Sequence, residues 1–160
     1  MARIDVLLCA LYILCMLNIA KVCSDYYHVT HDYVDSTLKK YLDSYIEEAS
    51  KRNVSLKKDK IMILFGKTLE DNVVGYCEDR SGVSHIIIDS SFFNSVREEE
   101  REMLLYHELA HCLNDRDHCD VEENEEPISI MHSSDYPIKL YSKEKEKLID
   151  ELFKKDERCK

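Results

Sequence analysis

The chain has 160 residues, enough for one domain, and its 32 acidic residues against 22 basic ones give a net charge of −10. This charge argues against nucleic acids and anionic membranes as partners, because both attract basic surfaces. An acidic surface also disfavours self-association near neutral pH, so we expect a monomer. The sequence has three glycines, two prolines and no internal repeat, which is typical of one compact domain.

An apolar run, Val6–Ala20, is the first predicted element, and a basic residue stands on each side of it. Its length suits the core of a signal peptide and is short of the roughly 20 residues of a membrane-spanning helix. Val22 and Ser24 are the small residues expected before a cleavage site. We therefore predict that residues 1–24 are a signal peptide and that 25–160 form a secreted domain with no stable membrane association. An uncleaved membrane anchor is the alternative.

Removal of this segment leaves four cysteines, Cys77, Cys112, Cys119 and Cys159. Four cysteines in an exported chain predict two disulfides, with three possible pairings. Cross-links of this kind would help to stabilise a core of modest size. The pairing stays open, because Cys112 has Cys119 and Cys77 as equally reasonable partners.

The remaining elements predict an α+β fold. Apolar residues three and four positions apart indicate helices, and short apolar runs bounded by turn residues indicate strands. In chain order we predict a helix at 34–49, strands at 61–65, 73–77 and 85–89, a helix at 96–113, a loop at 114–131 and a helix at 142–154. Asn94 or Ser95 is expected to cap the central helix, since Ser95 and Glu98 have the spacing of a capping box.

The central helix contains the sequence His107-Glu108-Leu109-Ala110-His111. Residues four apart lie on one face of a helix, so both imidazoles can bind one zinc ion. Glu108 follows the first histidine and is placed to act as general base towards a zinc-bound water. The apolar face of this helix and the predicted export favour a metal site over two surface histidines.

The stretch from His107 to His118, HELAHCLNDRDH, resembles the metzincin zinc peptidases, whose motif is HExxHxxGxxH followed by a Met-turn. The resemblance places Asn114 at the glycine that ends the helix. It places Asp117 at the third ligand, where snapalysin-like enzymes use aspartate. The same stretch is similar to small exported metallopeptidases with HELGHC followed by R-x-H, which implies His118 instead. Imidazole is the commoner zinc ligand, so we favour His118 and keep Asp117 as the alternative.

The sequence Ser129-Ile130-Met131-His132 matches the Met-turn, which implies that Met131 lies beneath the metal as an apolar floor. The resemblance also implies a strand ahead of the active-site helix that forms the rim of the cleft. The substrate would pair with this strand as an additional strand. By order and spacing the rim strand consists of His85, Ile86, Ile87 and Ile88. A buried central strand is the alternative for the same residues.

Together these features predict a zincin-like, specifically metzincin-like, α+β domain that binds one Zn²⁺ per chain. The predicted activity is that of an endopeptidase, in which Glu108 activates a metal-bound water against peptide bonds of a protein or peptide substrate. The alternative is a catalytically silent, secreted zinc-binding interaction protein on the same fold. The presence of Glu108 argues against this alternative, because metal binding alone needs the histidines and not the carboxylate.

Overall fold

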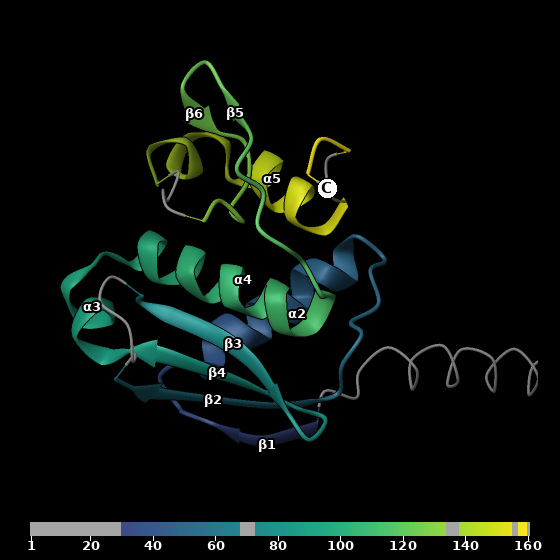
Figure 1. Cartoon of the computed structure of the whole chain (residues 1–160), viewed down its shortest axis with the longest axis vertical. Helices are drawn as coiled ribbons and strands as arrows, with labels where there is room; N and C mark the ends of the chain where they lie inside the picture. The colour runs from purple at the N-terminus through teal and green to yellow at the C-terminus, as the bar shows by residue number, and fades with distance from the viewer. Residues whose placement is uncertain (1–29, 68–72, 134–137, 155–156, 160) are drawn as a thin grey trace, which may run out of the picture.

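The computed structural model describes residues 30–67, 73–133, 138–154 and 157–159, drawn in colour in Figure 1. The predicted signal peptide lies outside these residues and stays a prediction. Among the helices of the described ranges, none combines the length and the apolar character that crossing a membrane requires.

Four strands form one mixed sheet in the order β1-β2-β4-β3 (Figure 1). Their bounds are Thr30–Val34 for β1, Lys60–Gly66 for β2, Gly75–Arg80 for β3 and Val83–Asp89 for β4. β1, β2 and β4 run parallel to one another, whereas β3 pairs antiparallel with β4. Ser81 and Gly82 join β3 to β4 with positive φ angles, as a two-residue hairpin turn requires. β3 and β1 are therefore the two edges of this sheet.

The helices are α2 at Lys39–Lys51, α3 at Ser90–Ser95, α4 at Glu98–Asn114 and α5 at Ile138–Lys154. In the sequence, a short hairpin of β5 (Glu122–Glu123) and β6 (Glu126–Pro127) lies between α4 and α5. Helices α2 and α4 lie side by side on one face of the sheet, and α5 packs on α4 from the other side (Figure 1).

The central position of α4 explains why its buried surface is so wide. Alternate residues of the inner strands, Ile61 and Ile63 in β2 and Ile86 and Ile88 in β4, are fully buried beneath the helices. Every residue of α4 from Met103 to Ala110 is buried as well. A helix enclosed between a sheet and another helix buries more than one stripe, so α4 is held rigidly.

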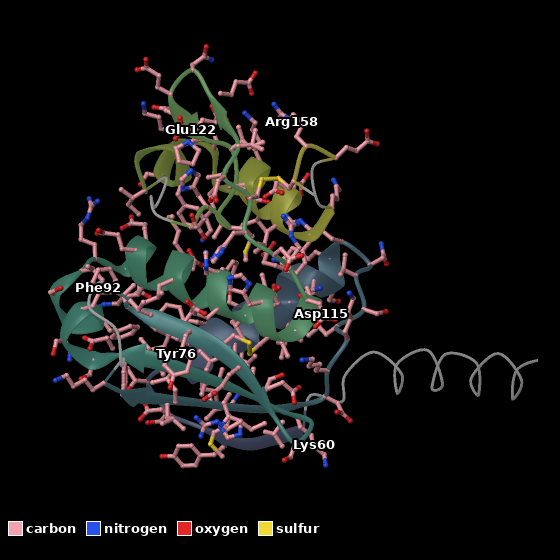
Figure 2. All side chains as sticks on the ribbon, in the orientation of Figure 1. Lys60, Tyr76, Phe92, Asp115, Glu122 and Arg158 are labelled. Carbon is pink, nitrogen blue, oxygen red and sulfur yellow. A yellow bond between two sulfur atoms is a disulfide. The ribbon has the colours of Figure 1, made fainter. Side chains whose placement is uncertain are left out.

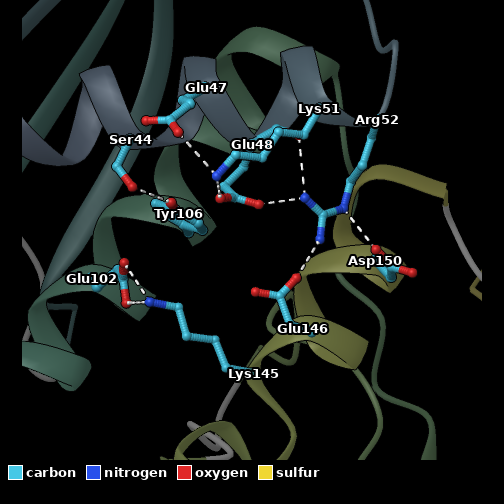
Figure 3. Close-up of polar contacts among 10 residues, drawn as sticks. All are labelled: Ser44, Glu47, Glu48, Lys51, Arg52, Glu102, Tyr106, Lys145, Glu146 and Asp150. Atoms are coloured by element: carbon cyan, nitrogen blue, oxygen red, sulfur yellow. Dashed lines mark hydrogen bonds and ion pairs between the residues drawn. The ribbon is translucent and has the colours of Figure 1, made fainter.

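Polar contacts hold α5 against α2 and α4 (Figure 3). The Arg52 guanidinium at the end of α2 donates to Asp150 at 2.7 Å and to Glu146 at 3.0 Å, both on α5. Lys145 of α5 donates to Glu102 of α4 at 2.6 Å. Helix α5 is thus held from two sides, and Arg52 makes more than one contact with it.

The structure corrects several predicted boundaries. Val34 ends strand β1, which the sequence analysis missed, and the first helix begins only at Lys39. The predicted Ser95–Glu98 capping box is wrong, because Ser95 belongs to the separate short helix α3. Helix α4 begins after an extended Arg97, whose backbone N–H donates to the side chain of Glu100 at 3.2 Å. The predicted loop at 114–131 contains the β5–β6 hairpin.

Candidate metal centre

Three histidine side chains converge at the end of α4. The Nε2 atoms of His107 and His111 are 3.1 Å apart, and the Nε2 of His118 is 3.2 Å from His111 and 3.3 Å from His107. A tetrahedral ion with bonds of about 2.0–2.1 Å separates two ligand nitrogens by about 3.3–3.4 Å. The three nitrogens therefore form a nearly equilateral triangle of the size that one metal ion fits.

Backbone carbonyls fix the protonation of the two helix histidines. The Nδ1 of His107 donates to the carbonyl oxygen of Ile130 at 2.8 Å, and the Nδ1 of His111 donates to that of Arg116 at 2.5 Å. Because a carbonyl oxygen only accepts, each ring has its proton on Nδ1 and a lone pair on Nε2. Lone pairs that face one another at 3.1 Å repel unless a cation lies between them, so the cluster suits a metal ion.

Burial keeps these imidazoles neutral. It lowers the pKa of His107 to about 4, and the carbonyl of Ile130 opposes this change only in part. Burial also lowers the pKa of His111. Both rings are therefore uncharged at neutral pH, which is the form that binds a metal.

His118, and not Asp117, completes the cluster of three nitrogens. Asp117 is exposed and lies on the same cavity without joining the group. The reason is the end of the helix. Asn114 is still helical, and Asp115 takes the left-handed conformation (φ 49°, ψ 45°) that the sequence analysis assigned to Asn114. Figure 2 labels Asp115 at this turn, and the one-residue delay brings the residue at 118 to the cluster.

Glu108 lies beside the cluster on the wall of the same cavity. Its side chain is buried, which raises the pKa of the carboxyl group to about 8. Gly75 of β3 lies directly against it. A Cβ at position 75 would be 3.0 Å from Glu108 Oε1 and 3.2 Å from Glu108 Cγ. The sequence analysis missed Gly75, because a glycine that leads a strand gives no signal of a contact with a helix.

The cavity is an open cleft of about 830 Å³ between β3 and the end of α4. Residues 73–79 line one side, and the HExxH residues with the loop at 115–118 line the other. The cleft therefore follows the length of an edge strand, with the histidine cluster and Glu108 along its inner wall.

The predicted rim strand at His85–Ile88 is wrong. These residues belong to β4, which pairs with β2 on one side and with β3 on the other, so the backbone groups of β4 are already used. The edge strand on the cleft is β3. The buried central strand, which the sequence analysis kept as the alternative for these residues, is the one observed, and composition agrees with it. An unbroken apolar run suits a central strand, whereas the mixed sequence of β3, Gly75–Arg80, suits an edge.

Met131 is fully buried in the turn from Ser129 to His132. The carbonyl oxygen of Ile130 in this turn accepts the hydrogen bond from His107. The carbonyl of Met131 accepts from the backbone N–H of Cys119 at 2.8 Å, next to the third histidine. The segment that resembles a Met-turn is thus hydrogen-bonded both to His107 and to the residue that follows His118.

Two disulfides brace the site, and Figure 2 shows them as yellow bonds. Cys77, which lines the cleft, bonds to Cys112 and ties β3 to α4. Cys119 bonds to Cys159 and ties the loop after His118 to the segment that follows α5. The prediction of two disulfides is confirmed, and the pairing that the sequence left open is resolved.

The fold and the site together define a class of protein. An α+β domain in which an HExxH helix and the following loop hold three histidines beside an open cleft has the arrangement of a metallopeptidase. A family model described as "Putative phage metallopeptidase" matches residues 27–152, and the chain belongs to this family. Membership supports peptidase activity, a metal cofactor and protein or peptide substrates. No curated protein and no solved structure matches the chain.

Proposed function

We propose that this protein is a secreted zinc endopeptidase that binds an extended peptide along β3 and cuts it beside Glu108. The observation that carries the proposal is the triangle of three Nε2 atoms, 3.1–3.3 Å apart, beside a buried glutamate on an open cleft. Structural metal sites are closed by four protein ligands, whereas a site with three ligands on a cleft leaves a position for water and substrate.

Zinc is the metal that this ligand set favours. Three neutral imidazoles from His107, His111 and His118 match the three-histidine catalytic zinc sites of proteins. Bound there, Zn²⁺ would supply Lewis acidity, which polarises a carbonyl group and lowers the pKa of water. We propose one zinc ion per chain.

Glu108 would move the proton in this reaction. As general base it takes a proton from the attacking water, and as general acid it passes that proton to the leaving amine. Burial alone raises its pKa to about 8, which favours the protonated form. A dication in the neighbouring cluster favours the carboxylate, so metal binding would also prepare the base.

We assign β3 as the strand with which the substrate pairs. Within the described residues, no strand pairs with the cleft side of β3, so its backbone groups are available for an added strand. Gly75 leaves no side chain between such a strand and Glu108. A peptide paired with β3 would therefore pass the histidine cluster in an extended conformation.

A metzincin-like arrangement is the finer proposal for this domain. The left-handed Asp115 precedes His118 by three residues, which repeats the glycine-to-histidine spacing of the metzincin motif after a helix one residue longer. The buried Met131 lies in a turn bonded to the ligand helix and to the ligand loop, as a Met-turn would. Two disulfides suit an oxidising compartment, which supports a signal peptide at 1–24 and secretion.

The test uses residues 25–160 with both disulfides formed, together with the variant Glu108→Gln. A matched control is Glu99→Gln, which changes an exposed glutamate on the same helix. Metal content by mass spectrometry and cleavage of an unfolded protein such as casein are measured for all three. We expect one zinc per chain throughout and a loss of cleavage of at least about 100-fold in Glu108→Gln alone.

Each other result has a clear meaning. Zinc in all three proteins without cleavage in any would favour the non-catalytic zinc-binding protein. Absence of zinc from all three would reject the metal centre. Cleavage by Glu108→Gln at the wild-type rate would remove Glu108 from the mechanism.

A further inference from the structure

We propose that Glu151, on the C-terminal helix, is a positioning residue of the metal centre. The inference rests on the metal site of the proposed function, although it concerns metal binding and not peptide cleavage. Glu151 acts on His107 and His111 through the two backbone segments that orient their rings.

The first step concerns what orients the rings. His107 donates to the carbonyl of Ile130, and His111 donates to the carbonyl of Arg116. Neither carbonyl belongs to α4, so the helix alone does not fix the rotation of the two imidazoles. Their direction depends on where the loop at 116 and the turn at 129–131 are held.

The second step concerns what holds these two segments. One carboxylate oxygen of Glu151, Oε1, accepts a hydrogen bond from Arg116 Nη2 at 2.7 Å. The other, Oε2, accepts from the hydroxyl of Ser129. The same hydroxyl accepts from the backbone N–H of Met131 at 3.0 Å, beyond the carbonyl that orients His107. A single carboxylate thus links both orienting segments.

Arg116 strengthens the link to α5. Its Nη1 donates to the carbonyl oxygens of Glu151 at 3.0 Å and of Leu152 at 2.7 Å, in the last turn of the helix. Cations at a helix C-terminus stabilise carbonyls that have no partner within the helix. The loop that carries His118 is therefore held to α5 by side-chain and backbone contacts together.

The burial of the Arg116–Glu151 ion pair indicates that it serves to hold two segments in place and not to add stability. The side chains of Arg116 and Glu151 are only 6% and 10% exposed. A buried ion pair loses so much hydration that it adds little to stability compared with apolar residues of the same volume. Groups that hydrogen-bond a metal ligand, here the carbonyls of Ile130 and Arg116, commonly change metal affinity 10–100-fold, and Glu151 holds the two segments that carry these carbonyls. The Glu151 carboxylate suits this role in metal binding, because each of its oxygens bonds to a different segment and the distance between the two segments is thereby fixed.

The test compares Glu151→Gln with Asp150→Asn. Glutamine keeps the shape of Glu151 but has only one oxygen for its two donors. Asp150 is the neighbouring carboxylate, and it is 46% exposed and pairs with Arg52 and Lys154 away from the cluster. Zinc affinity is measured by competition with a chromophoric chelator. The visible spectrum of the Co²⁺-substituted protein reports ligand geometry, and thermal unfolding of the metal-free protein reports the fold.

We expect Glu151→Gln to bind zinc about 10–100-fold more weakly and to change the Co²⁺ spectrum, while the metal-free protein still unfolds cooperatively. Asp150→Asn should keep the wild-type affinity and spectrum. If Glu151→Gln lowers the unfolding temperature but keeps both the affinity and the spectrum, its role is only structural and the inference is overturned.

A second variant covers the case in which Glu151→Gln does not fold. Ser129→Ala removes one hydrogen bond to the carboxylate and leaves the Arg116 ion pair in place. It should weaken zinc binding and shift the Co²⁺ bands in the same direction, whereas wild-type values for both would overturn the inference. The two proposals can fail separately. If the wild-type chain cuts no peptide but these variants bind zinc more weakly, the proposed function is rejected and the positioning role is supported. Cleavage by a wild-type chain whose variants bind zinc normally would do the reverse.

Discussion

Replacing Gly75 by alanine tests the contact between the edge strand and the proposed general base. The added methyl carbon would lie 3.0 Å from Glu108 Oε1, 3.1 Å from Leu104 Cδ1 and 3.2 Å from Glu108 Cγ. Carbon atoms pack best at about 3.5–4.0 Å, so Glu108 has to retreat by roughly half an ångström. Leu104 is fully buried, which leaves the Glu108 side chain as the group with room to move into the cleft.

The expected cost follows from this displacement. Misplacing a catalytic group by 1 Å can lower a rate about 100-fold, so half an ångström corresponds to about 10-fold. That is about 1.4 kcal/mol of transition-state stabilisation. The three atoms nearest to the new Cβ belong to Glu108 and Leu104 and not to a histidine, so zinc affinity should stay within about twofold of wild type.

The assay measures kcat/KM on a peptide substrate together with zinc content. Gly82→Ala is the matched control, since it changes a glycine in the turn that follows the same strand. Its φ of +80° strains an alanine, but no atom lies within 4 Å of the new Cβ. The control should lower the unfolding temperature and keep kcat/KM of the folded protein. Full kcat/KM in Gly75→Ala, or a loss of zinc in parallel with activity, would refute the reasoning.

Three further predictions concern the metal-free fold, the third ligand and the cross-link. The pKa of Glu108 rises from 4.5 to about 8 on folding, so between these values the folded protein keeps a proton that the unfolded chain releases. The Glu108 contribution to metal-free stability should therefore fall as pH rises through this window, by about 3 kcal/mol at pH 7, while His107, whose pKa is lowered to about 4, contributes in the opposite direction in wild type and variant alike. Glu108→Gln should lose this dependence in thermal unfolding between pH 5 and 9, and parallel profiles would contradict the prediction. His118→Ala should weaken zinc binding by at least about 100-fold in calorimetry, whereas Asp117→Asn should change it by less than about threefold. The opposite order would make Asp117 the third ligand. Replacing Cys119 and Cys159 by serine should cost about 4 kcal/mol in denaturant unfolding, because their bond closes a loop of 40 residues. A cost below about 1 kcal/mol would mean that this bond does not constrain the unfolded chain.

Features that depend on neighbours in the sequence were predictable. The HExxH spacing places His107 and His111 on one face of any helix, whatever packs around it. The α+β order and the two long helices α4 and α5 followed from apolar spacing for the same reason. The exact end of α4 was not predictable, because Asn114 and Asp115 both tolerate the left-handed conformation. This one-residue choice decides which side chain reaches the cluster.

Features that depend on pairing across the fold were beyond the sequence. The strand order, which makes β3 and not His85–Ile88 the rim of the cleft, arises from contacts between distant segments. The disulfide pairing arises in the same way. Strand β1 was missed because Thr30–Val34 alternates too few apolar residues to stand out from a loop. No pattern around Glu151 indicates that its carboxylate joins two loops at the metal centre.

The residues that hold the histidine cluster in place are synthesised after the histidines themselves. The three histidines leave the ribosome within twelve residues of one another, from His107 to His118. The groups that hold them come later, with Glu151 on α5 and then Cys159, which bonds to Cys119 across 40 residues. Domains generally fold as units, and the positioning role proposed for Glu151 predicts that the cluster acquires its geometry only once this late segment has docked. A peptidase of this design would have no working metal centre while its own nascent chain, still extended and cleavable, is the nearest substrate.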